Sequence, residues 1–311
     1  MKRLSILIII ISTIAILGCS PGPEAAPAGN QGDQIVVNHE LGETILNGLP
    51  QRVVVFDYGI LDAIDTIGQD IVGLPKQTLP AYLEKYNSDD YTDVGSLKEP
   101  NFEVLYELNP DLIIISARQL ELYDQLEAIA PTLYLTIDGG SYMDDFKHNM
   151  DIIGQIYDSE ELLAERLETI EENIKELHEL ATSKSKNALF IMANDGNLSA
   201  YGTGSRFGMI HNEFGLEAAD PNIDASTHGQ KVTFEYIMEQ DADYIFVMDR
   251  AVIAGGETSA MKVMDNELVR STRAYKDDNI IYLDPFTWYV SSGGLTGTQN
   301  MIDEIYEGLS D

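Results

Sequence analysis

Apolar segments of strand length alternate with helical patterns over most of the chain. Strands that are apolar on both faces and are separated by helices are typical of parallel α/β layers. This pattern runs through the first half of the chain and begins again after residue 183. Apolar and polar residues alternate over residues 35–47, which predicts a β-hairpin before the first strand of the pattern. The predicted strands are RVVVFD (52–57), IVGLP (71–75), DLIIIS (111–116), TLYLTI (132–137), ALFIMAN (188–194), LSAYG (198–202), DYIFVMD (243–249) and NIIYLD (279–284).

Residues 158–182 predict one long amphipathic helix between the two halves. Asp158 and Glu161 have the spacing of a capping box, and no Gly or Pro interrupts the segment. Such a helix is about 36 Å long, so we expect a rigid strut that joins two α/β lobes and leaves a ligand cleft between them. An ordinary amphipathic helix inside one large domain is the alternative. The apolar stripe comprises Leu163, Leu167, Ile170, Ile174, Leu177 and Ala181.

The start of the chain predicts export and lipid attachment. A basic start precedes an apolar run at residues 4–17, which is shorter than the ~20 residues that span a bilayer. Ile16-Leu17-Gly18-Cys19 resembles a bacterial lipobox, in which cleavage leaves Cys19 as a lipidated N-terminus; a secreted protein without a lipid is the alternative. Cys19 is the only cysteine, which excludes disulfides, thiolate metal sites and a cysteine nucleophile in the folded part.

These patterns together predict an α/β protein whose two lobes contain parallel-rich sheets and are joined by one long α-helix. The next residues after Cys19 are rich in Pro, Gly and Ala, which is typical of a flexible tether. The predicted segments are a signal peptide (1–18), a lipidated cysteine and tether (19–33), an N-terminal lobe (34–158), an interlobe helix (159–182) and a C-terminal lobe (183–311).

The charge of the chain excludes one class of partner. There are 52 acidic residues against 19 Lys and Arg, and the formal net charge is −33. Such a surface repels nucleic acids and anionic lipid headgroups, so we expect no nucleic-acid function. Any anionic ligand needs a local patch of positive charge. Such a patch can outweigh the repulsion from the surface acids, because salt screens charges that lie more than ~8–10 Å away.

An internal repeat marks two arginines. FEVLYELNPDLIIISAR (102–118) and FEYIMEQDADYIFVMDR (234–250) carry Phe-Glu, Asp and Arg at identical offsets. Arg118 and Arg250 therefore follow equivalent strands, and ligands of parallel α/β sheets bind beyond the carboxyl ends of the strands. Arg206 follows LSAYG in a Gly-rich turn before a predicted helix start, which also favours anions. A single arginine is more typical of an ion pair with a carboxylate, but the repeat favours a basic floor for an anionic ligand.

Two further residues are candidates for the cleft edge. His228 lies in a polar loop before a predicted helix, and Tyr289 follows the strand NIIYLD. A phenolate oxygen is a hard donor that suits Fe(III), whereas a lone loop histidine is usually only a hydrogen-bonding residue. The other histidines do not cluster, so a dedicated Zn or Mn site is not indicated. Lys76, Tyr58 and Trp288 are further candidates for the cleft lining, with loop or core packing as the alternative.

Enzyme motifs are weak in this chain. GTGSRFG (202–208) follows a strand like a dinucleotide-binding loop, but Phe207 occupies the place of the third glycine. No Gly-x-Ser-x-Gly or Walker sequence occurs. We therefore expect a binding protein without enzymatic activity and without a permanently bound cofactor.

Four segments together resemble one family. Residues 94–119, 198–215, 226–237 and 282–296 are similar to the catecholate-siderophore-binding lipoproteins of bacterial iron-uptake ABC transporters, especially the petrobactin-binding group. The resemblance extends from about residue 34 to the C-terminus. It implies the class III periplasmic-binding-protein fold, with two α/β lobes, one long helix and only slight closure on binding.

The resemblance also implies a ligand and the residues that bind it. Arg118, Arg206 and Arg250 match an arginine triad that holds the anionic ferric siderophore. His228 and Tyr289 match residues that complete the iron shell when a siderophore supplies only four donors. A receptor for a hydroxamate siderophore, haem or cobalamin is the alternative within the same class.

The implied partners are the ferric siderophore, the permease of an ABC importer, and the membrane through the lipid anchor, with the protein itself a monomer. Such proteins are expected to dock to the permease through acids, one set on each lobe. Glu121 and Glu267 are candidates for this contact, and a solvated acidic surface is the alternative for both.

Overall fold

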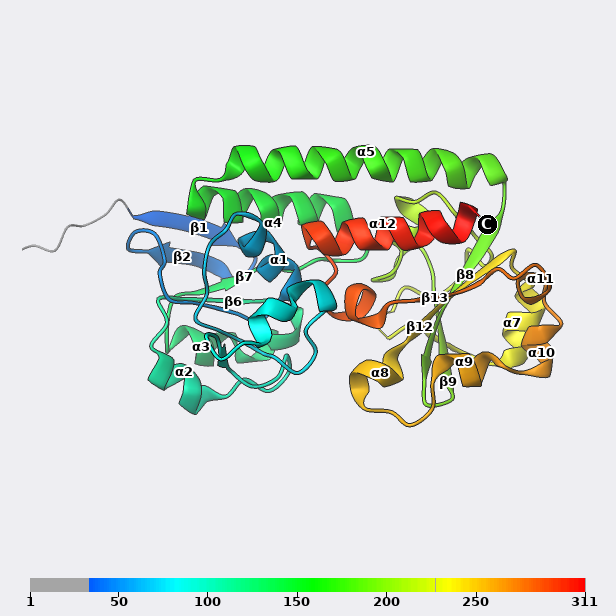
Figure 1. The fold of residues 1–311 in the computed structure, drawn as a ribbon, viewed down its shortest axis with the longest axis horizontal. Helices are drawn as coiled ribbons and strands as arrows, with labels where there is room; N and C mark the ends of the chain where they lie inside the picture. Colours follow the sequence, from blue (N-terminus) through cyan, green and yellow to red (C-terminus); the bar gives the residue numbers. More distant parts are fainter. Residues whose placement is uncertain (1–33, 227, 311) are drawn as a thin grey trace, which may run out of the picture.

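The computed structural model describes residues 34–226 and 228–310. The predicted signal peptide, Cys19 and the tether lie outside the described residues. Two α/β lobes lie side by side, and helix α5 (Glu160–Lys184) runs above both of them (Figure 1). Within the described part of the chain, no helix is both long enough and apolar enough to cross a membrane.

The N-terminal lobe is built on a five-stranded sheet in which all neighbouring strands are parallel. Its central strands are entirely buried because helices cover both faces. In sheet order the strands are β5 (Thr92–Asp93), β4 (Gly73–Leu74), β3 (Val53–Val55), β6 (Leu112–Ile115) and β7 (Thr132–Tyr134). The predicted hairpin before them is confirmed as a separate antiparallel pair, β1 (Ile35–His39) and β2 (Gly42–Leu46).

Short helices connect these strands. Residues 117–127 are divided into a 3₁₀ turn and a short α-helix. The helices of this lobe are α1 (Tyr58–Thr66), η1 (Ala81–Asn87), α2 (Phe102–Leu108), η2 (Ala117–Leu122), α3 (Tyr123–Glu127) and α4 (Tyr142–Tyr157).

The C-terminal lobe contains a six-stranded mixed sheet. Strands β8, β12 and β13 are parallel, whereas β9 is antiparallel to β8, and β11 is antiparallel to β9. The strand order is β11 (Gln230–Val232), β9 (Asn197–Tyr201), β8 (Asn187–Asn194), β12 (Tyr244–Asp249) and β13 (Ile280–Leu283), with β10 (Glu217–Ala218) paired to the start of β8. The helices are α6 (Met209–Asn212), α7 (Phe234–Gln240), α8 (Arg250–Ala254), α9 (Ala260–Met264), α10 (Glu267–Arg270), α11 (Arg273–Lys276), the π-type turn η3 (Phe286–Val290) and α12 (Leu295–Ser310).

Helix α5 confirms the predicted apolar stripe. All six of its predicted stripe residues are buried, and α4 and α12 lie beneath it (Figure 1). The predicted capping box is wrong. Asp158 has a φ of 52° and ends α4 by donating its N–H to the Gly154 carbonyl, so the N-cap of α5 is Ser159. A left-handed residue between two helices turns the chain sharply, and its side chain is then not placed to cap the second helix.

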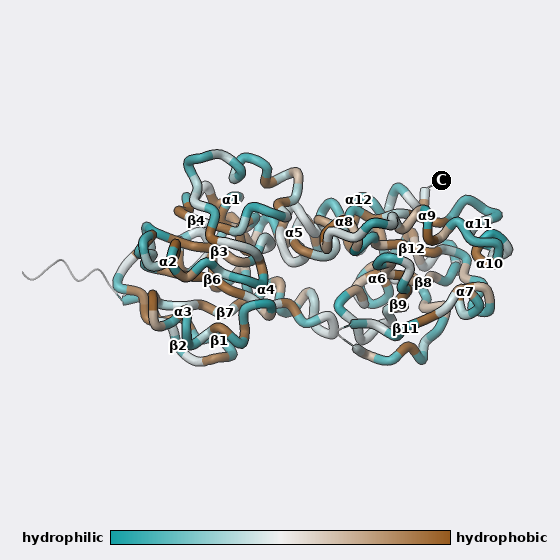
Figure 2. Tube along the Cα trace, turned by 90° about the horizontal axis from the view of Figure 1, so that it is seen from below, coloured by the Kyte–Doolittle hydropathy of each residue, from teal (hydrophilic) through white to brown (hydrophobic). Residues whose placement is uncertain are grey.

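One hydrophobic cluster extends through both lobes. It contains Leu61 and Phe146 of the N-terminal lobe, Leu167 of α5, and Phe190 and Trp288 of the C-terminal lobe. Figure 2 shows hydrophobic segments at the strands of both lobes, with hydrophilic positions on the outer loops. The lobes are therefore packed on a shared core beneath α5 and are not connected by a bare linker.

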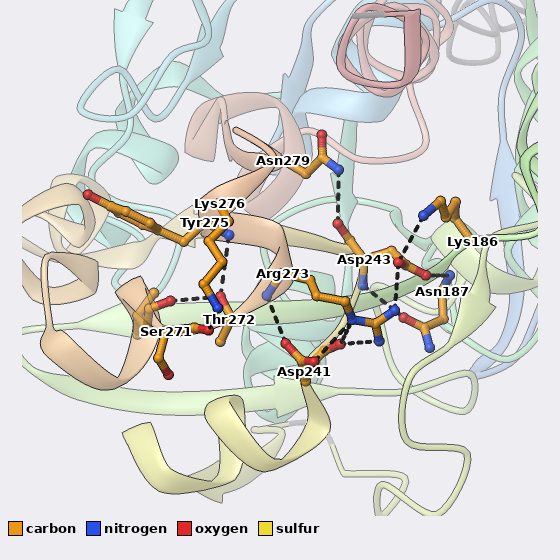
Figure 3. Close-up of polar contacts among 11 residues, drawn as sticks. Lys186, Asn187, Asp241, Asp243, Ser271, Thr272, Arg273, Tyr275, Lys276 and Asn279 are labelled. Carbon is orange, nitrogen blue, oxygen red and sulfur yellow. Dashed lines mark hydrogen bonds and ion pairs between the residues drawn. The ribbon is translucent and has the colours of Figure 1, made fainter.

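The aspartates of the internal repeat have a structural role at the starts of the two equivalent strands. Asp111 accepts hydrogen bonds from the backbone N–H groups of Gln51 and Arg52, each at 2.8 Å. Asp243 accepts from the N–H of Asn187 at 3.2 Å and pairs with Lys186 and Arg273 (Figure 3). The repeated arginines lie at the opposite ends of the same strands.

Candidate functional site: an arginine cleft

Tyr289 is the centre of the predicted site. The Nη2 atoms of Arg118 and Arg206 both donate to its backbone carbonyl, at 2.6 Å and 2.9 Å. The Nε of Arg250 donates to its phenol oxygen at 3.1 Å. Tyr289 belongs to the π-type turn η3, a rare conformation that is frequently found at functional sites. Three arginines from three separate segments therefore converge on one residue.

Local hydrogen bonds position the two repeated arginines. Ser116 and Gln119 form a capping box at the start of η2, and the Gln119 side chain also donates to the Leu97 carbonyl, which ties the neighbouring loop to Arg118. On the other lobe, Asp249 accepts from the N–H groups of Ala251 and Ala260, at 3.1 Å and 2.7 Å, and so begins α8 at Arg250. Each arginine thus extends from the rigid end of a buried strand, as the repeat predicts.

Arg206 reaches the site by a different route from the one predicted. The strand before it, β9, is antiparallel to its neighbour β8, so its end does not lie at the carboxyl edge of the parallel strands. The helix that follows, α6, has only four residues and begins at Met209. The guanidinium of Arg206, and not a helix terminus, therefore brings positive charge to Tyr289.

The three arginines form no ion pair with a carboxylate within the described residues. Their guanidinium carbons lie 4.5–5.9 Å from the centre of the Tyr289 ring, within the range of cation–π attraction. The alternative of ordinary ion pairs is therefore wrong for Arg118, Arg206 and Arg250. Because a carbonyl and a phenol carry no full charge, the positive charge of the cluster remains available to a ligand.

The cluster changes the acidity of its own members. Burial lowers the pKa of Arg206 to about 10, with a further contribution from the charge of Arg118. Burial acts to raise the pKa of the Tyr289 phenol, but the hydrogen bond from Arg250 and the charges of the three arginines outweigh it, so the pKa lies below its ordinary value. Tyr289 is therefore disposed to become an anionic oxygen donor.

The cluster forms the floor of a cleft between the lobes. Two adjoining cavities, of about 320 and 400 Å³, share Lys98, Arg118, Arg250 and Tyr289. The larger cavity is also lined by Arg206 and by the exposed His228. All five predicted binding residues thus border one cavity, and no Asp or Glu lines either cavity in the described part of this acidic protein.

Sequence reasoning missed part of the lining. Lys98 is exposed in the loop before α2 and adds a fourth cation. Asn194, Asn197 and Ser199 come from the β8–β9 hairpin. Lys98 lies in residues 94–119, one of the segments that resemble the family, so the sequence could have indicated it as a cleft residue. No motif or repeat in the sequence marks the three hairpin residues.

Three predicted lining residues lie outside the cleft. Trp288 is fully buried and its indole N–H donates to Glu304 at 2.6 Å. Tyr58 is also fully buried, and its hydroxyl donates to the Pro75 carbonyl at 2.9 Å. The Lys76 ammonium donates to the Ser88 carbonyl at 2.7 Å. The packing alternative is correct for all three, because each polar atom has a partner away from the cavity.

The two predicted docking acids are both exposed but are placed differently. Glu121 lies in η2, three residues after Arg118. Glu267 begins α10, which lies at the far side of the C-terminal lobe from the N-terminal lobe in both views (Figures 1 and 2). They do not occupy equivalent positions in the two lobes.

The donors of the cleft suit an anionic complex more than a bare metal ion. Within residues 34–226 and 228–310, no three His, Cys, Asp or Glu side chains lie together in a way that could hold a metal. The cleft instead offers guanidinium donors, one ammonium, one imidazole and one acidified phenol. Guanidinium groups match anionic oxygens in pairs and keep their charge.

The chain is similar to known binding proteins over most of its length. The profile of the family described as periplasmic binding protein matches residues 53–287. The petrobactin-binding protein YclQ of Bacillus subtilis is 45% identical over 99% of both chains, and its crystal structure has a TM-score of 0.88 at 48% identity, covering 90% of this chain and 99% of that one. The ferric-anguibactin-binding protein FatB of Vibrio anguillarum is 31% identical over 98% of this chain and 97% of its own. The crystal structure of the periplasmic catecholate-siderophore binding protein VctP of Vibrio cholerae has a TM-score of 0.82 at 34% identity, covering 88% of this chain and all of that one.

Proposed function

The chain belongs to the periplasmic binding protein family, and from that premise we propose that it captures ferric catecholate siderophores in the arginine cleft and delivers them to an ABC importer for iron uptake. The three relatives named above are binding proteins, for petrobactin, ferric anguibactin and a catecholate siderophore. We propose further that it acts as a monomer, without catalysis and without a resident cofactor, and that lipid on Cys19 anchors it outside the cell membrane.

One observation carries this proposal: among residues 34–226 and 228–310, the three arginines around Tyr289 have no carboxylate ion-pair partner, and no acid lines the cleft. A ferric complex of two or three catecholates is an anion, and its oxygens are acceptors for guanidinium donors. A neutral ferric hydroxamate would leave this charge uncompensated in a partly buried site, which is costly. The cluster therefore favours the catecholate class over hydroxamates.

His228 and Tyr289 extend the proposal to chelators with too few donors. Both side chains border the cavity that Arg118, Arg206 and Arg250 line. A siderophore with four donor atoms leaves two octahedral positions on iron, and an imidazole and a phenolate are suitable ligands for them. The lowered pKa of Tyr289 makes the ionised form of that donor easier to reach.

Delivery requires contact with the permease. Glu121 and Glu267 remain proposals for that contact. The internal repeat offers a second pair, because Glu103 and Glu235 are both exposed in the first turns of the equivalent helices α2 and α7. Acids at equivalent positions of the two lobes suit a permease made of two related subunits. Iron import is measured after both acids of one pair are replaced by lysine, and the pair whose replacement abolishes import is the docking pair.

Fluorescence of the single tryptophan tests the ligand class. Trp288 adjoins Tyr289 in the chain, so a bound ferric complex should quench its emission. The purified protein is titrated with a hexadentate ferric catecholate, a tetradentate ferric catecholate, a ferric hydroxamate and haem, with calorimetry as a second readout. We expect binding of both catecholates, with weak or no binding of the others.

Arginine variants provide the controls. Arg118→Ala and Arg250→Ala should each weaken catecholate binding at low salt, and the loss should shrink at high salt because ions screen the attraction. Arg166→Ala removes an exposed arginine of α5 that does not line the cleft and should bind like the wild type. Binding of hydroxamate or haem alone would contradict the proposal.

A further inference from the structure

The hairpin of β8 and β9 forms one wall of the arginine cleft with neutral side chains. Its two-residue turn, Asp195-Gly196, has φ values of 47° and 82°, as a type I′ turn requires. Asp195 also accepts from the N–H groups of Glu257 and Thr258, at 2.7 Å and 2.9 Å. The hairpin tip is therefore held in place, which is what a wall of a binding site needs.

The cleft-facing side of this hairpin changes from aromatic to polar side chains towards the tip. The register pairs Phe190 with Tyr201, Met192 with Ser199, and Asn194 with Asn197. Phe190 and Tyr201 are fully buried and pack on each other edge-on at 6.0 Å between ring centres. The opposite face stays apolar to the tip, since its side chains belong to a separate core cluster. Only the side that borders the cleft becomes polar. Met192 and Tyr201 line the inner part of this wall, and Asn194, Asn197 and Ser199 line its part towards the hairpin tip.

Two of these polar groups have no internal partner. Among the described residues, neither the Asn194 amide nor the Ser199 hydroxyl forms a hydrogen bond with another protein group, whereas Asn197 donates to the Asn194 carbonyl across the turn, at 3.3 Å. An asparagine can donate and accept at once, and a serine can do the same. Both groups are half-buried, so a ligand that covers them must satisfy them or incur a desolvation cost.

We propose that Asn194 and Ser199 form a second subsite, which binds neutral amide or hydroxyl groups on the arms that link the iron-binding groups of the chelator. The proposal rests on the function proposed above and adds a basis for selection among ferric catecholates. Cations gather at Tyr289 and neutral donors and acceptors lie along the hairpin. This division suits a ligand that is anionic at the iron and carries amides in its backbone.

Two probes separate the subsite from the arginine cluster. One is the ferric complex of catechol itself, which has no arms, and the other is the ferric complex of a chelator whose catechols are joined through amide-bearing arms. In the double variant Asn194→Ala/Ser199→Ala, we expect affinity for the armed complex to fall by about tenfold, since two neutral hydrogen bonds are lost. Affinity for the plain complex should not change, because its contacts lie at the arginines.

Asn222→Ala is the matched control, since it removes an exposed asparagine outside the cleft. A double variant that binds the armed complex like the wild type would overturn the subsite, and so would an equal loss for both probes. If wild type binds neither probe, the proposed function itself fails. If the thermal midpoint shows that the double variant is unfolded, Ser199→Ala alone carries the same comparison.

Discussion

At the scale of single residues, Tyr289 determines how the three arginines of the cleft are arranged. Its carbonyl accepts from two arginines and its phenol from a third, so cations that repel one another are held together by a neutral residue. A carboxylate in the same place would bind the arginines more strongly but would cancel charge that the ligand needs. The backbone carbonyl is independent of the side chain, so substitutions at 289 can test the phenol alone.

The phenol of Tyr289 should ionise at lower pH than the buried tyrosines. Its pKa lies below the ordinary value, whereas burial raises the pKa of Tyr58, Tyr142 and Tyr201 to about 12. A spectrophotometric titration should show an early phenolate component that Tyr289→Phe removes. In Arg250→Ala the same component should move to higher pH, because the hydrogen bond and charge that stabilise the phenolate are lost. An unchanged early component in Tyr289→Phe would contradict the assignment.

Tyr289→Phe should also discriminate between chelators. Phenylalanine keeps the ring near the arginines but removes the oxygen donor. We expect a clear loss of affinity for tetradentate ferric catecholates and little change for hexadentate ones, whose iron has no open position. Calorimetric titration of both ligand types measures the difference, and equal losses would argue against direct contact with iron.

At the scale of elements, two buried carboxylates connect separate elements, Asp62 linking α1 to α12 and Asp243 linking β12 to the start of β8. Their effects on the free energy of unfolding should depend on pH in opposite directions. Asp62 of α1 accepts from the N–H of Gly297 at 3.0 Å and so caps α12 from another element. Asp243 holds the start of β12 to Lys186 and Arg273 (Figure 3). Both are nearly inaccessible, and within the described residues Asp243 has cationic partners whereas Asp62 has none.

Asp62 should lower stability at neutral pH. Burial raises its pKa from 3.8 to about 6, against the opposing effect of its hydrogen bonds. The folded state therefore binds more protons between these values, and the free energy of unfolding decreases as pH rises from about 4 to 6. Asp62→Asn should remove this slope and stabilise the protein at pH 7 by on the order of 1–3 kcal/mol. Denaturant unfolding across this range tests it, and a destabilised variant at pH 7 would show that the charge is needed.

Asp243 should act in the opposite direction. Burial alone would raise its pKa, but the Lys186 and Asn187 hydrogen bonds and the charge of Arg273 lower it below 3.8. Its contribution is therefore complete above pH 3.8 and is lost as pH falls through the lower folded value. Asp243→Ala should cost about 1 kcal/mol at pH 7, because the half-buried N–H of Asn187 and the partly exposed Lys186 and Arg273 lose their acceptor. Asp241→Ala, at an exposed partner of Arg273, should cost less; equal effects would contradict the role of burial.

At the scale of the whole molecule, a net charge of −33 surrounds a cleft that carries positive charge. Self-repulsion among the surface acids opposes the compact state, and salt screens it. The arrangement gives salt two opposite effects, since it should stabilise the fold but weaken the attraction of an anionic ligand.

The thermal midpoint of the free protein should therefore rise with sodium chloride from low ionic strength to about 0.15 M, over which the screening length falls to ~8 Å. Calorimetry measures the midpoint, and sucrose at matched osmolality serves as the uncharged control. A midpoint that falls with salt would show that specific ion pairs outweigh the general repulsion.

The sequence by itself determined the elements and part of the site. Alternating apolar strands, the α5 stripe and the repeat that ends at Arg118 and Arg250 are confirmed in the structure, because burial imposes a local period on the chain. Periodicity needs only neighbouring positions, so it can be recognised without knowledge of the fold.

Only the tertiary structure decided how these elements meet. It made β9 antiparallel, placed Asp158 in a left-handed turn, buried Trp288, and brought Lys98 and the hairpin face to the cavity. It also chose the Tyr289 carbonyl as the acceptor for two arginines that are distant in sequence. Backbone carbonyls are the same at every residue, so the sequence cannot show which one accepts a hydrogen bond from an arginine. The direction of a strand depends on partners that are distant in sequence, so the local sequence cannot show it either.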